Sequence, residues 1–388
     1  MDLLTEAKEL LETMKTDRRT IHQQPELGMD LPHTTAYVKK RLIEMGYEPE
    51  DCGKAGVTAT VGKPGKCILL RADMDALPMK EESGLPFAST INAAHTCGHD
   101  SHTAMLLGAA QLLKNHESEL NGTVKLMFQP AEELLQGAKD MIANGILENP
   151  HVDVASGMHI DPMTPVGTLS WSRKYVCASA DVFSINIKGQ GGHGAMPQNA
   201  IDPIVVAAYI IIALQEIQSR EISGQDMIVM TYGVVQSGSK ENIIPDSAVI
   251  RGTLRALDAK VLANVKQRME EISVGIGKVY RCDVDFTWDF GCGPNSNNED
   301  LAMEMHQYQA EIVGEDHMVE AAPAMGSEDF SYVSESVPSV FGWMGVKPEG
   351  LEHPAPLHSP KILLDEQAMP YGAALHANCA MRWLEKNG

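Results

Sequence analysis

The spacing of hydrophobic residues predicts helices at the start of the chain and alternating strands and helices after them. Apolar side chains between Leu3 and Met14 recur at helical spacing, and a second helix is expected to end near Met45. Strands are expected at 57–61, 67–72, 123–129 and 152–158, with helices at 102–115 and 136–143. This alternation is typical of an α/β fold with a mostly parallel sheet flanked by helices, in which ligands bind where strands end in loops.

A different order of elements begins after residue 176. The pattern predicts a strand, a helix, two strands, a helix and a strand, over residues 181–187, 203–219, 227–235, 248–256, 258–276 and 280–288. This order is that of the ferredoxin-like split βαβ fold. We therefore expect a discontinuous α/β domain formed by residues 1–176 and 293–388, with a smaller α+β domain, residues 177–292, inserted in it.

The charge balance and the cysteines limit the partners and the location of the protein. The 388 residues include 31 Lys and Arg against 52 Asp and Glu, and the net charge of −21 would repel nucleic acid and anionic membranes. The seven cysteines are scattered and odd in number, which argues for reduced thiols rather than a disulfide framework. No signal peptide is recognisable, and the longest apolar run, 204–214, is too short to span a bilayer. We expect a cytoplasmic protein.

Metal-binding side chains are concentrated in the segment 95–102. It contains three histidines, a cysteine and an aspartate, and Cys97 and His99 are separated by one glycine, so that both can approach one centre from an extended loop. A lone cysteine or histidine is more often structural, but this density reverses that preference. Thiolate, imidazole and carboxylate together are ligands of zinc, manganese and related divalent ions, and the full set suggests two ions.

Two adjacent carboxylates, Glu132 and Glu133, follow the predicted strand 123–129. Neighbouring residues at a strand end project in different directions, so one carboxylate can bind metal while the other moves a proton between water and a leaving amine. The alternative is a solvated acidic helix start. Pro130 and the apolar strand before it favour the first interpretation, because they place the pair at the carboxyl end of a sheet.

Three further side chains are expected near strand ends. His159 follows the predicted strand 152–158 and His358 lies in a loop between a strand and a helix, so both are candidate ligands. Asp75 follows the strand 67–72, and it either orients a metal-bound imidazole or caps the next turn.

The segment 189–194 matches the GxGxxG pattern of dinucleotide-binding sites, which would indicate an oxidoreductase. That pattern requires a helix that opens within the glycine loop, but Pro197 intervenes and the predicted helix begins only near Pro203. The context therefore argues against a dinucleotide site. His193 in this segment is either a surface residue or a hydrogen-bond donor to an oxyanion in a neighbouring site.

Six motifs, in register along essentially the whole chain, resemble metallopeptidase family 20. They are RADMDALP at 71–78, CGHD at 97–100, FQPAEE at 128–133, GHGAMP at 192–197, GSEDF at 326–330 and HSP at 358–360. The chain is similar in particular to the branch that contains hippurate hydrolase, bacterial N-acyl-amino-acid amidohydrolases and plant indole-acetyl-amino-acid hydrolases.

The resemblance implies a dinuclear-metal hydrolase domain with an inserted lid or dimerisation domain. It implies that Glu132 is the general base, that Asp75 orients the metal centre, and that His193 steadies the oxyanion in the active site of the partner subunit of a homodimer. The metal ligands that it implies are Cys97, His99, Glu133, His159 and His358. Asn242 and Arg255 in the inserted domain are candidates for holding a substrate carboxylate, although a solvated strand residue is the simpler interpretation of Arg255.

One position departs from the wider family, in which a His-x-Asp motif supplies the first ligand. Asp73 occupies the histidine position here, and Cys97 and His99 take the place of those ligands, as in the named branch. We expect two divalent ions per subunit, zinc or manganese, with cobalt and nickel as alternatives, since thiolate favours zinc.

The expected reaction is hydrolysis of the amide bond of an N-acyl amino acid, with an acetyl, benzoyl or similar acyl group. The alternatives are an N-acetyl-diaminopimelate-type deacetylase, a small-dipeptide carboxypeptidase and a non-catalytic metal-binding protein.

Overall fold

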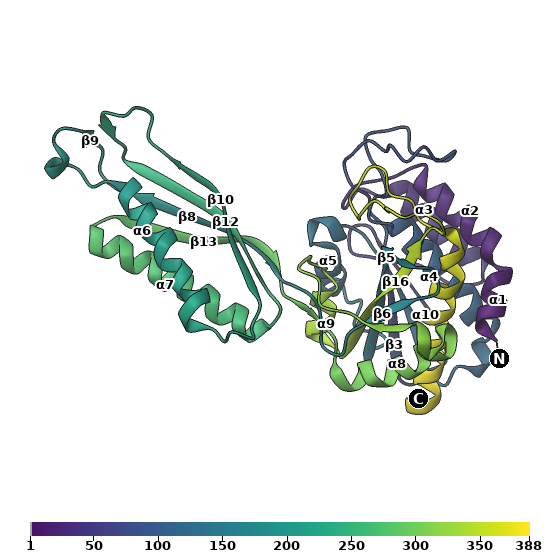
Figure 1. The fold of residues 1–388 in the computed structure, drawn as a ribbon. Coiled ribbons are helices and arrows are strands. Elements are labelled where there is room, and N and C mark those ends of the chain that lie inside the picture. The colour runs from purple at the N-terminus through teal and green to yellow at the C-terminus, as the bar shows by residue number, and fades with distance from the viewer. Residues whose placement is uncertain (1) are drawn as a thin grey trace. The chain divides into compact units, whose positions relative to one another are not determined.

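The computed structural model describes residues 2–388. The chain divides into two compact units (Figure 1). The first unit contains the residues up to Val176 together with Ser296–Ala322 and Asp329–Gly388, and the second contains Cys177–Asn295 and Pro323–Glu328. The short segment Pro323–Glu328 belongs to the second unit because its backbone carbonyls accept hydrogen bonds there, one of them from Ala178 N at 3.0 Å.

The first unit is built on an eight-stranded sheet. In sheet order the strands are β1 (Glu50–Cys52), β2 (Gly56–Gly62), β4 (Thr123–Gln129), β3 (Cys67–Asp73), β5 (Val154–Pro165), β16 (Ser339–Lys347), β6 (Leu169–Trp171) and β15 (Met318–Glu320). The central strands β4, β3, β5 and β16 are parallel. β1 pairs antiparallel with β2, β2 with β4 and β6 with β16, whereas β15 pairs parallel with β6. The carboxyl ends of the four central strands therefore meet at one edge of the sheet.

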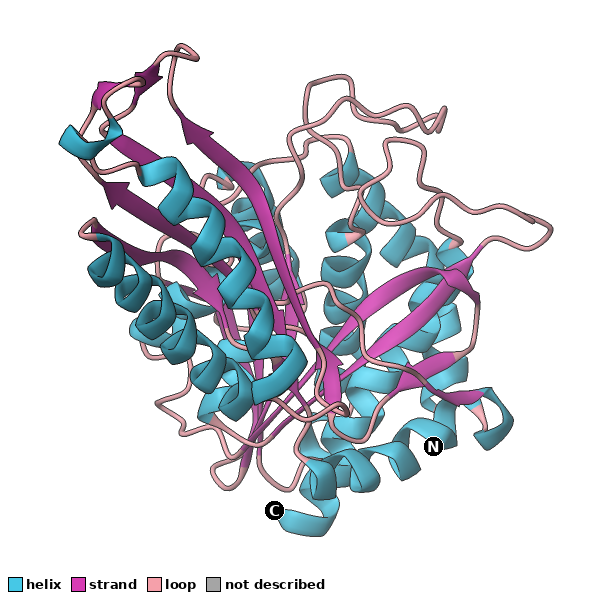
Figure 2. Cartoon of the chain, turned by 60° about the vertical axis from the view of Figure 1, so that its left-hand side comes forward, coloured by secondary structure: helices cyan, strands magenta, loops and turns pink. Residues whose placement is uncertain are grey.

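Helices lie on both sides of this sheet (Figure 2). They are α1 (Leu3–Glu9), α2 (Leu11–His22), α3 (Pro32–Glu44), α4 (His99–Asn115), α5 (Gly137–Ala143), α8 (Glu299–Val313), α9 (Ser331–Ser336) and α10 (Met369–Asn387). α4 and α10 pack against each other and against β3, while α5 contacts β4 and α9 contacts β16. Within residues 2–388 no helix is both long and apolar enough to cross a membrane.

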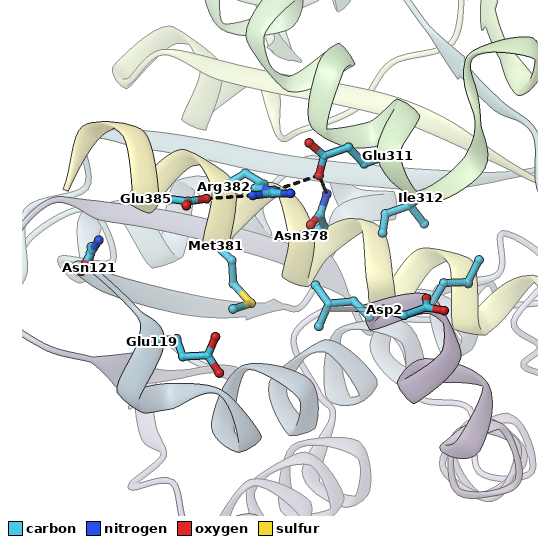
Figure 3. A pocket seen from close by; sticks show the side chains of 11 residues that line it. Asp2, Glu119, Asn121, Glu311, Ile312, Asn378, Met381, Arg382 and Glu385 are labelled. Atoms are coloured by element: carbon cyan, nitrogen blue, oxygen red, sulfur yellow. Dashed lines mark hydrogen bonds and ion pairs between the residues drawn. The ribbon is translucent and has the colours of Figure 1, made fainter.

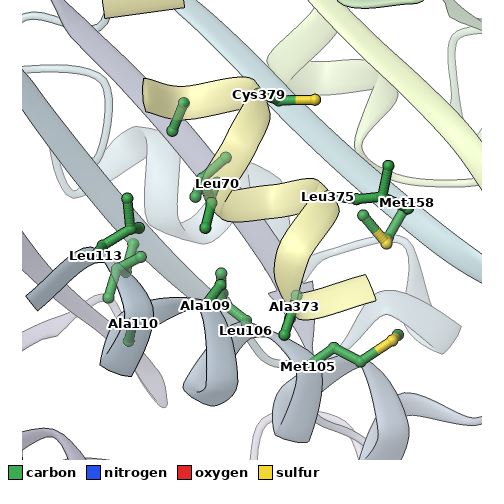
Figure 4. Close-up of a cluster of buried hydrophobic side chains, with 14 of the residues drawn as sticks. Leu70, Met105, Leu106, Ala109, Ala110, Leu113, Met158, Ala373, Leu375 and Cys379 are labelled. Atoms are coloured by element: carbon green, nitrogen blue, oxygen red, sulfur yellow. The ribbon is translucent and has the colours of Figure 1, made fainter. Parts of the chain in front are cut away.

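The core of the first unit lies between α4, α10 and the central strands. Figure 4 shows Leu70 of β3 and Met158 of β5 among apolar side chains of the two helices. The helices can approach closely because Gly108 and Gly372 lie at the contact, where an added Cβ would come within 2.5 Å of Met14 and 2.0 Å of Met105, respectively. Burial of this apolar surface holds the parallel strands, and hence their carboxyl ends, in place.

The second unit is a four-stranded antiparallel sheet packed against two helices. Its elements are β8 (Ala180–Lys188), α6 (Pro203–Glu216), β10 (Ile228–Ser237), β12 (Ser247–Ala256), α7 (Ala259–Tyr280) and β13 (Asp283–Cys292), with a small ribbon of β9 (Gly192–His193) and β11 (Ile243–Ile244). A further pair, β7 (Tyr175–Cys177) and β14 (Asn295–Ser296), spans the boundaries between the units along the chain. The sheet order β10-β12-β8-β13 is that of a split βαβ fold, so the predicted fold class is confirmed.

Candidate metal centre

The predicted ligands come from the edge of the large sheet where its parallel strands end. Asp73 is the last residue of β3, and Glu132 and Glu133 follow β4 after two residues. β5 contributes His159, and the chain after β16 contributes His358. Ligands at the carboxyl ends of parallel strands are the usual arrangement in α/β folds.

A glycine in the left-handed backbone conformation brings Cys97 and His99 together. The expectation from the sequence that they lie in an extended loop is therefore wrong. Gly98 has a φ of 83° and is the N-cap of α4, and His99 is the first residue of that helix. Gly98 also lies so close to Ile160 that an added Cβ would come within 2.5 Å of its side chain. Only glycine fits both the conformation and the space.

The ring of His99 is oriented by the backbone of Asp75. His99 Nδ1 lies 2.8 Å from the Asp75 carbonyl oxygen and therefore carries the proton that it donates. Nε2 is then left with a lone pair, and this buried atom has no hydrogen-bond partner within residues 2–388. A bound metal ion would provide the partner that this lone pair lacks.

The Asp75 carboxylate positions the Glu132-Glu133 turn. Its two oxygens accept the backbone N–H groups of Glu132 at 3.0 Å and Glu133 at 3.3 Å, while its Oδ1 lies 3.4 Å from His99 Nδ1. The turn is a short 3-10 helix, and Ala131 before it has a φ of 51°, a strained conformation for a residue with a Cβ. Asp75 thus connects the two candidate ligand segments.

His159 lies within β5, which continues to Pro165, and does not follow the strand as predicted. Its Nδ1 donates to the Ile160 carbonyl at 2.7 Å, so that Nε2 presents a lone pair 3.2 Å from Cys97 Sγ. Burial, and then the neighbouring His102, lower the pKa of His159 well below its usual value. A neutral imidazole is the form that binds metal.

His358 reaches the same place from the loop between β16 and α10. Its φ is 64°, and its backbone N–H donates to the Thr96 carbonyl at 2.9 Å, beside Cys97. Its Nε2 lies 3.5 Å from Glu133 Oε1, and Glu133 Oε1 lies 4.0 Å from His99 Nε2. The His358 side chain is 53% exposed, so the cluster is open to solvent on the side of His358.

The five predicted ligands form overlapping groups whose ligand atoms lie within 4.8 Å of one another. Cys97 belongs to one group with His99 and His159 and to another with Glu133 and His358, and Glu132 joins a third with His99 and Glu133. Burial raises the pKa values of both the Cys97 thiol and the Glu133 carboxyl. A bound cation would reverse both shifts, since it stabilises thiolate and carboxylate.

Sequence reasoning did not assign a role to a second layer of polar residues behind these ligands. Asp73 pairs with both Arg71 and His102, and all three side chains are almost completely buried. The sequence signal for His102 was its spacing of three residues from His99, which places both on one face of a helix.

Another group of buried side chains connects α2 to the start of α4. His22 Nδ1 lies 2.8 Å from Asp100 Oδ2, and its Nε2 lies 3.0 Å from Glu81 Oε1.

Because His22 interacts with these two carboxylates, its contribution to the free energy of unfolding depends on pH. Burial disfavours the charged ring, but the hydrogen bonds to Asp100 and Glu81 outweigh it and raise the pKa of His22 from 6.5 to about 9. Because the folded-state pKa exceeds the unfolded one, the stabilisation is complete below about pH 6.5 and is lost as the pH rises through 9. The shift corresponds to about 3 kcal/mol in the free energy of unfolding.

We therefore expect the stability advantage of the wild type over His22→Gln to shrink by about 3 kcal/mol between pH 6.5 and 9. Urea unfolding of both proteins at matched metal loading, over a series of pH values, measures this difference. A difference that stays constant over the range would show that His22 is not charged in the folded protein.

The second unit places His193 and Asn242 together. His193 in β9 pairs with Ile243 in β11, and Gly194 N donates to the Asn242 carbonyl at 2.9 Å. Ala195 N donates to His193 Nδ1 at 3.0 Å, which leaves the proton of the exposed neutral ring on Nε2. Arg255 lies at the far end of β12 from this ribbon, and its Nη1 donates to the Met325 carbonyl at 2.9 Å.

The glycine-rich segment around His193 forms a strand and a loop and does not open a helix. A short 3-10 helix follows at Pro197–Asn199, and the next α-helix, α6, begins at Pro203 with Asp202 as its N-cap. The segment therefore lacks the helix N-terminus on which a dinucleotide pyrophosphate would bind.

The first unit also has a surface pocket of about 370 Å³ that is separate from the predicted ligands. Figure 3 shows Arg382 in this pocket between Glu311 and Glu385, with which it forms ion pairs of 2.8 and 2.9 Å. Asn378 also donates to Glu311. The pocket contains none of the predicted site residues and is not the candidate site.

Residues 69–382 match the sequence pattern of a known family, described as peptidase family M20/M25/M40. The chain belongs to this family. Sequences similar to it include IAA-amino acid hydrolase ILR1-like 2 of Arabidopsis thaliana, with 39% identity over 97% of this chain and 87% of that protein. Hippurate hydrolase of Campylobacter jejuni is 34% identical over 99% of this chain and 100% of that protein.

A solved M20 structure shares the fold. It is the YXEP protein of Bacillus subtilis, described as a dinuclear metal-binding peptidase, with a TM-score of 0.83 and 34% identity over 97% of this chain and 99% of that one. The family resemblance inferred from the sequence motifs is therefore confirmed.

Proposed function

We propose that this chain is a metal-dependent amidohydrolase that cleaves the amide bond of N-acyl amino acids, releasing a carboxylic acid and a free amino acid. The observation that carries the proposal is the meeting of Cys97, His99, Glu133, His159 and His358 beside Glu132 at one sheet edge. Two proteins similar to this chain are named as an IAA-amino acid hydrolase and a hippurate hydrolase.

The residues fit two divalent cations. Buried His99 Nε2 and Glu133 Oε1 have no hydrogen-bond partner within the described chain, and Cys97 is shared by two ligand groups. His99 and His159 each donate their Nδ1 proton to a backbone carbonyl, which fixes the tautomer that ligation requires. The thiolate favours zinc, and manganese is the alternative.

When bound, the two ions would supply an acidified water and polarise the amide carbonyl. Glu132, held in place through its backbone N–H by Asp75, accepts the proton of the attacking water. The same carboxyl group then returns this proton to the leaving nitrogen, so that the free amino acid departs as an amine. Burial of Glu132, which is 7% exposed, limits competition from bulk solvent.

The second unit is proposed as a lid and dimerisation domain, and His193 as a residue that acts in the active site of the partner subunit. The hydrogen bond from Ala195 leaves an exposed Nε2–H donor on His193, which is the form needed to stabilise an oxyanion. α6 exposes Ile204, Val205, Tyr209 and Ile212, and β10 is an edge strand of its sheet. Exposed apolar side chains and an unpaired strand edge favour association with another subunit.

Mixed dimers test this arrangement. In a dimer of one Glu132→Gln and one His193→Ala subunit, action of His193 across the interface leaves one site with both defects and one site intact. Random mixing should then restore about a quarter of wild-type activity, because about half of the dimers are mixed. If His193 acts within its own subunit, each site keeps one defect and the mixture stays inactive, as each variant is alone.

A substrate panel tests the reaction itself. Metal-reconstituted protein should release free amino acid from at least one of N-acetyl, N-benzoyl and indole-acetyl amino acids, and chelation should abolish the release. Chromatographic detection of the free amino acid identifies both the acyl group and the amine. Cleavage of N-acetyl-diaminopimelate or of dipeptides alone would replace the proposed substrate class with one of those alternatives.

A further inference from the structure

A chain of buried polar groups lies behind the proposed ligands and takes no part in the proposed mechanism. It consists of Arg71, Asp73 and His102, of which none is more than 1% exposed. Charged and polar side chains are costly to bury unless each is paired. The pairing in this case connects strand β3 to the backbone beside His159.

The hydrogen bonds of His102 fix its proton. Ile160 N–H donates to His102 Nε2 at 2.9 Å, and since a backbone N–H can only donate, Nε2 is the acceptor. The proton is therefore on Nδ1, which donates to Asp73 Oδ1 at 2.6 Å. Both ring nitrogens are occupied, so His102 is not a metal ligand, although it forms a potential ligand group with Asp73 and His99.

Asp73 is held in turn by Arg71. Arg71 Nη1 lies 2.7 Å from Asp73 Oδ2, and the same guanidinium donates to Gln129 Oε1 at 2.9 Å and Asp329 Oδ1 at 3.3 Å. Gln129 Nε2 and the backbone N–H of Ala138 also donate to Asp329. This explains why the GSEDF motif contains a buried aspartate: it anchors the guanidinium that holds Asp73.

At the other end of this series of buried polar groups, His102 fixes the peptide next to His159. Ile160 is held on both sides, since its N–H donates to His102 and its carbonyl accepts the proton of His159 Nδ1 at 2.7 Å. The His102 and His159 rings also meet edge to face, with centroids 4.5 Å apart. A shift of Ile160 would therefore move the His159 ring and its Nε2 lone pair.

We propose that His102 is a positioning residue for the metal centre, which sets the orientation of His159 through Ile160, and that Arg71 and Asp73 hold His102 in the tautomer that this requires. The proposal rests on the metal centre of the proposed function. It assigns to Asp73, at the position where the wider family has a ligand histidine, the role of fixing the proton of another histidine.

Variants at His102 distinguish its hydrogen bond with the Ile160 N–H from its hydrogen bond with Asp73. His102→Gln keeps an acceptor that can reach the Ile160 N–H, His102→Asn keeps only a donor near Asp73, and His102→Leu keeps neither. His376→Leu is the matched control. His376 on α10 is also a histidine in the first unit, it is 2% exposed, and its Nδ1 has no hydrogen-bond partner among residues 2–388. Both leucine variants bury the same new side chain.

The readouts are the Zn²⁺ dissociation constant, measured by competition with a chromophoric chelator, and the visible spectrum of the Co²⁺-loaded protein. We expect His102→Leu and His102→Asn to weaken Zn²⁺ binding about 10- to 100-fold and to change the Co²⁺ spectrum. His102→Gln should stay within about threefold of wild type, since it retains the acceptor for Ile160. His376→Leu should lower the melting temperature without changing either readout.

Equal Zn²⁺ affinity and Co²⁺ spectra in His102→Leu and His376→Leu would overturn the proposal, as would equal weakening in the Gln and Leu variants. These readouts do not depend on amide cleavage. A wild-type protein that binds metal but cleaves no N-acyl amino acid would therefore refute the proposed function and leave the positioning role intact.

Discussion

Replacing Glu132 with glutamine is expected to lower kcat about 10³-fold, while the protein keeps its metal ions. Glutamine has the shape of glutamate but cannot accept the proton of the attacking water. The backbone hydrogen bond from Glu132 to Asp75 is unaffected by the substitution, so the turn should stay in place. Steady-state kinetics and elemental analysis of the same preparation measure both quantities.

Glu133→Gln provides the matched comparison for this prediction. It makes the same chemical change in the neighbouring residue of the same turn, but Glu133 Oε1 lies 3.5 Å from His358 Nε2 and 4.0 Å from His99 Nε2, two proposed ligand atoms. We expect Glu133→Gln to lose metal as well as activity. If the two variants lost metal equally, or if Glu132→Gln kept a kcat within a few-fold of wild type, Glu132 would not be the general base.

Replacing Cys97 with alanine is expected to weaken metal binding strongly. Cys97 belongs to two of the groups of converging ligand atoms, so its loss removes a ligand from both. Even residues that only orient ligands typically contribute 10- to 100-fold to metal affinity, and we expect Cys97→Ala to lose more than about 100-fold. Isothermal titration of the metal-free protein with Zn²⁺ measures the change.

Cys379→Ala is the control for Cys97→Ala. Cys379 is also a buried, free cysteine, but it lies on α10 in the hydrophobic core. Its substitution removes the same sulfur and leaves a similar cavity, so it should lower stability without weakening metal binding. Equal Zn²⁺ affinity in the two variants would exclude Cys97 as a ligand.

Much of the fold could be predicted from the sequence because hydrophobic periodicity marks strands and helices directly. The split βαβ order of the inserted segment is one example, and the strand predicted at 123–129 is observed as β4 with the same bounds. The start of α4 was predicted three residues too late, because the polar residues His99, Asp100 and Ser101 hide the first turn of the helix. A glycine in the left-handed region before this turn is a stop signal more often than a start signal.

The candidate ligands could be named from motifs, but their geometry could not. The strand β5 extends past His159 because its neighbour β16 pairs with it to Pro165, a contact between segments far apart in the sequence. The role of Asp75 also depends on such a contact, since its carboxylate accepts the N–H groups of Glu132 and Glu133 across the sheet edge. Long-range contacts of this kind leave no local signal.

The buried chain from Asp329 to His102 was invisible to sequence reasoning for the same reason. Arg71 in β3 and Asp329 just before α9 are 258 residues apart, so only the folded chain brings them together. A charged residue considered alone is expected at the surface. Its burial can be explained only when the residues that pair with it are known.

The central claim is that this site binds divalent ions and uses them to hydrolyse N-acyl amino acids. The most direct test is to titrate metal-free protein with Zn²⁺ or Mn²⁺ in the presence of the best substrate of the panel and to measure the amino acid released. We expect no release without metal, and a rate that rises as up to about two ions bind per chain. Full hydrolysis by the metal-free protein, or none by the metal-saturated protein on any N-acyl amino acid, would contradict it.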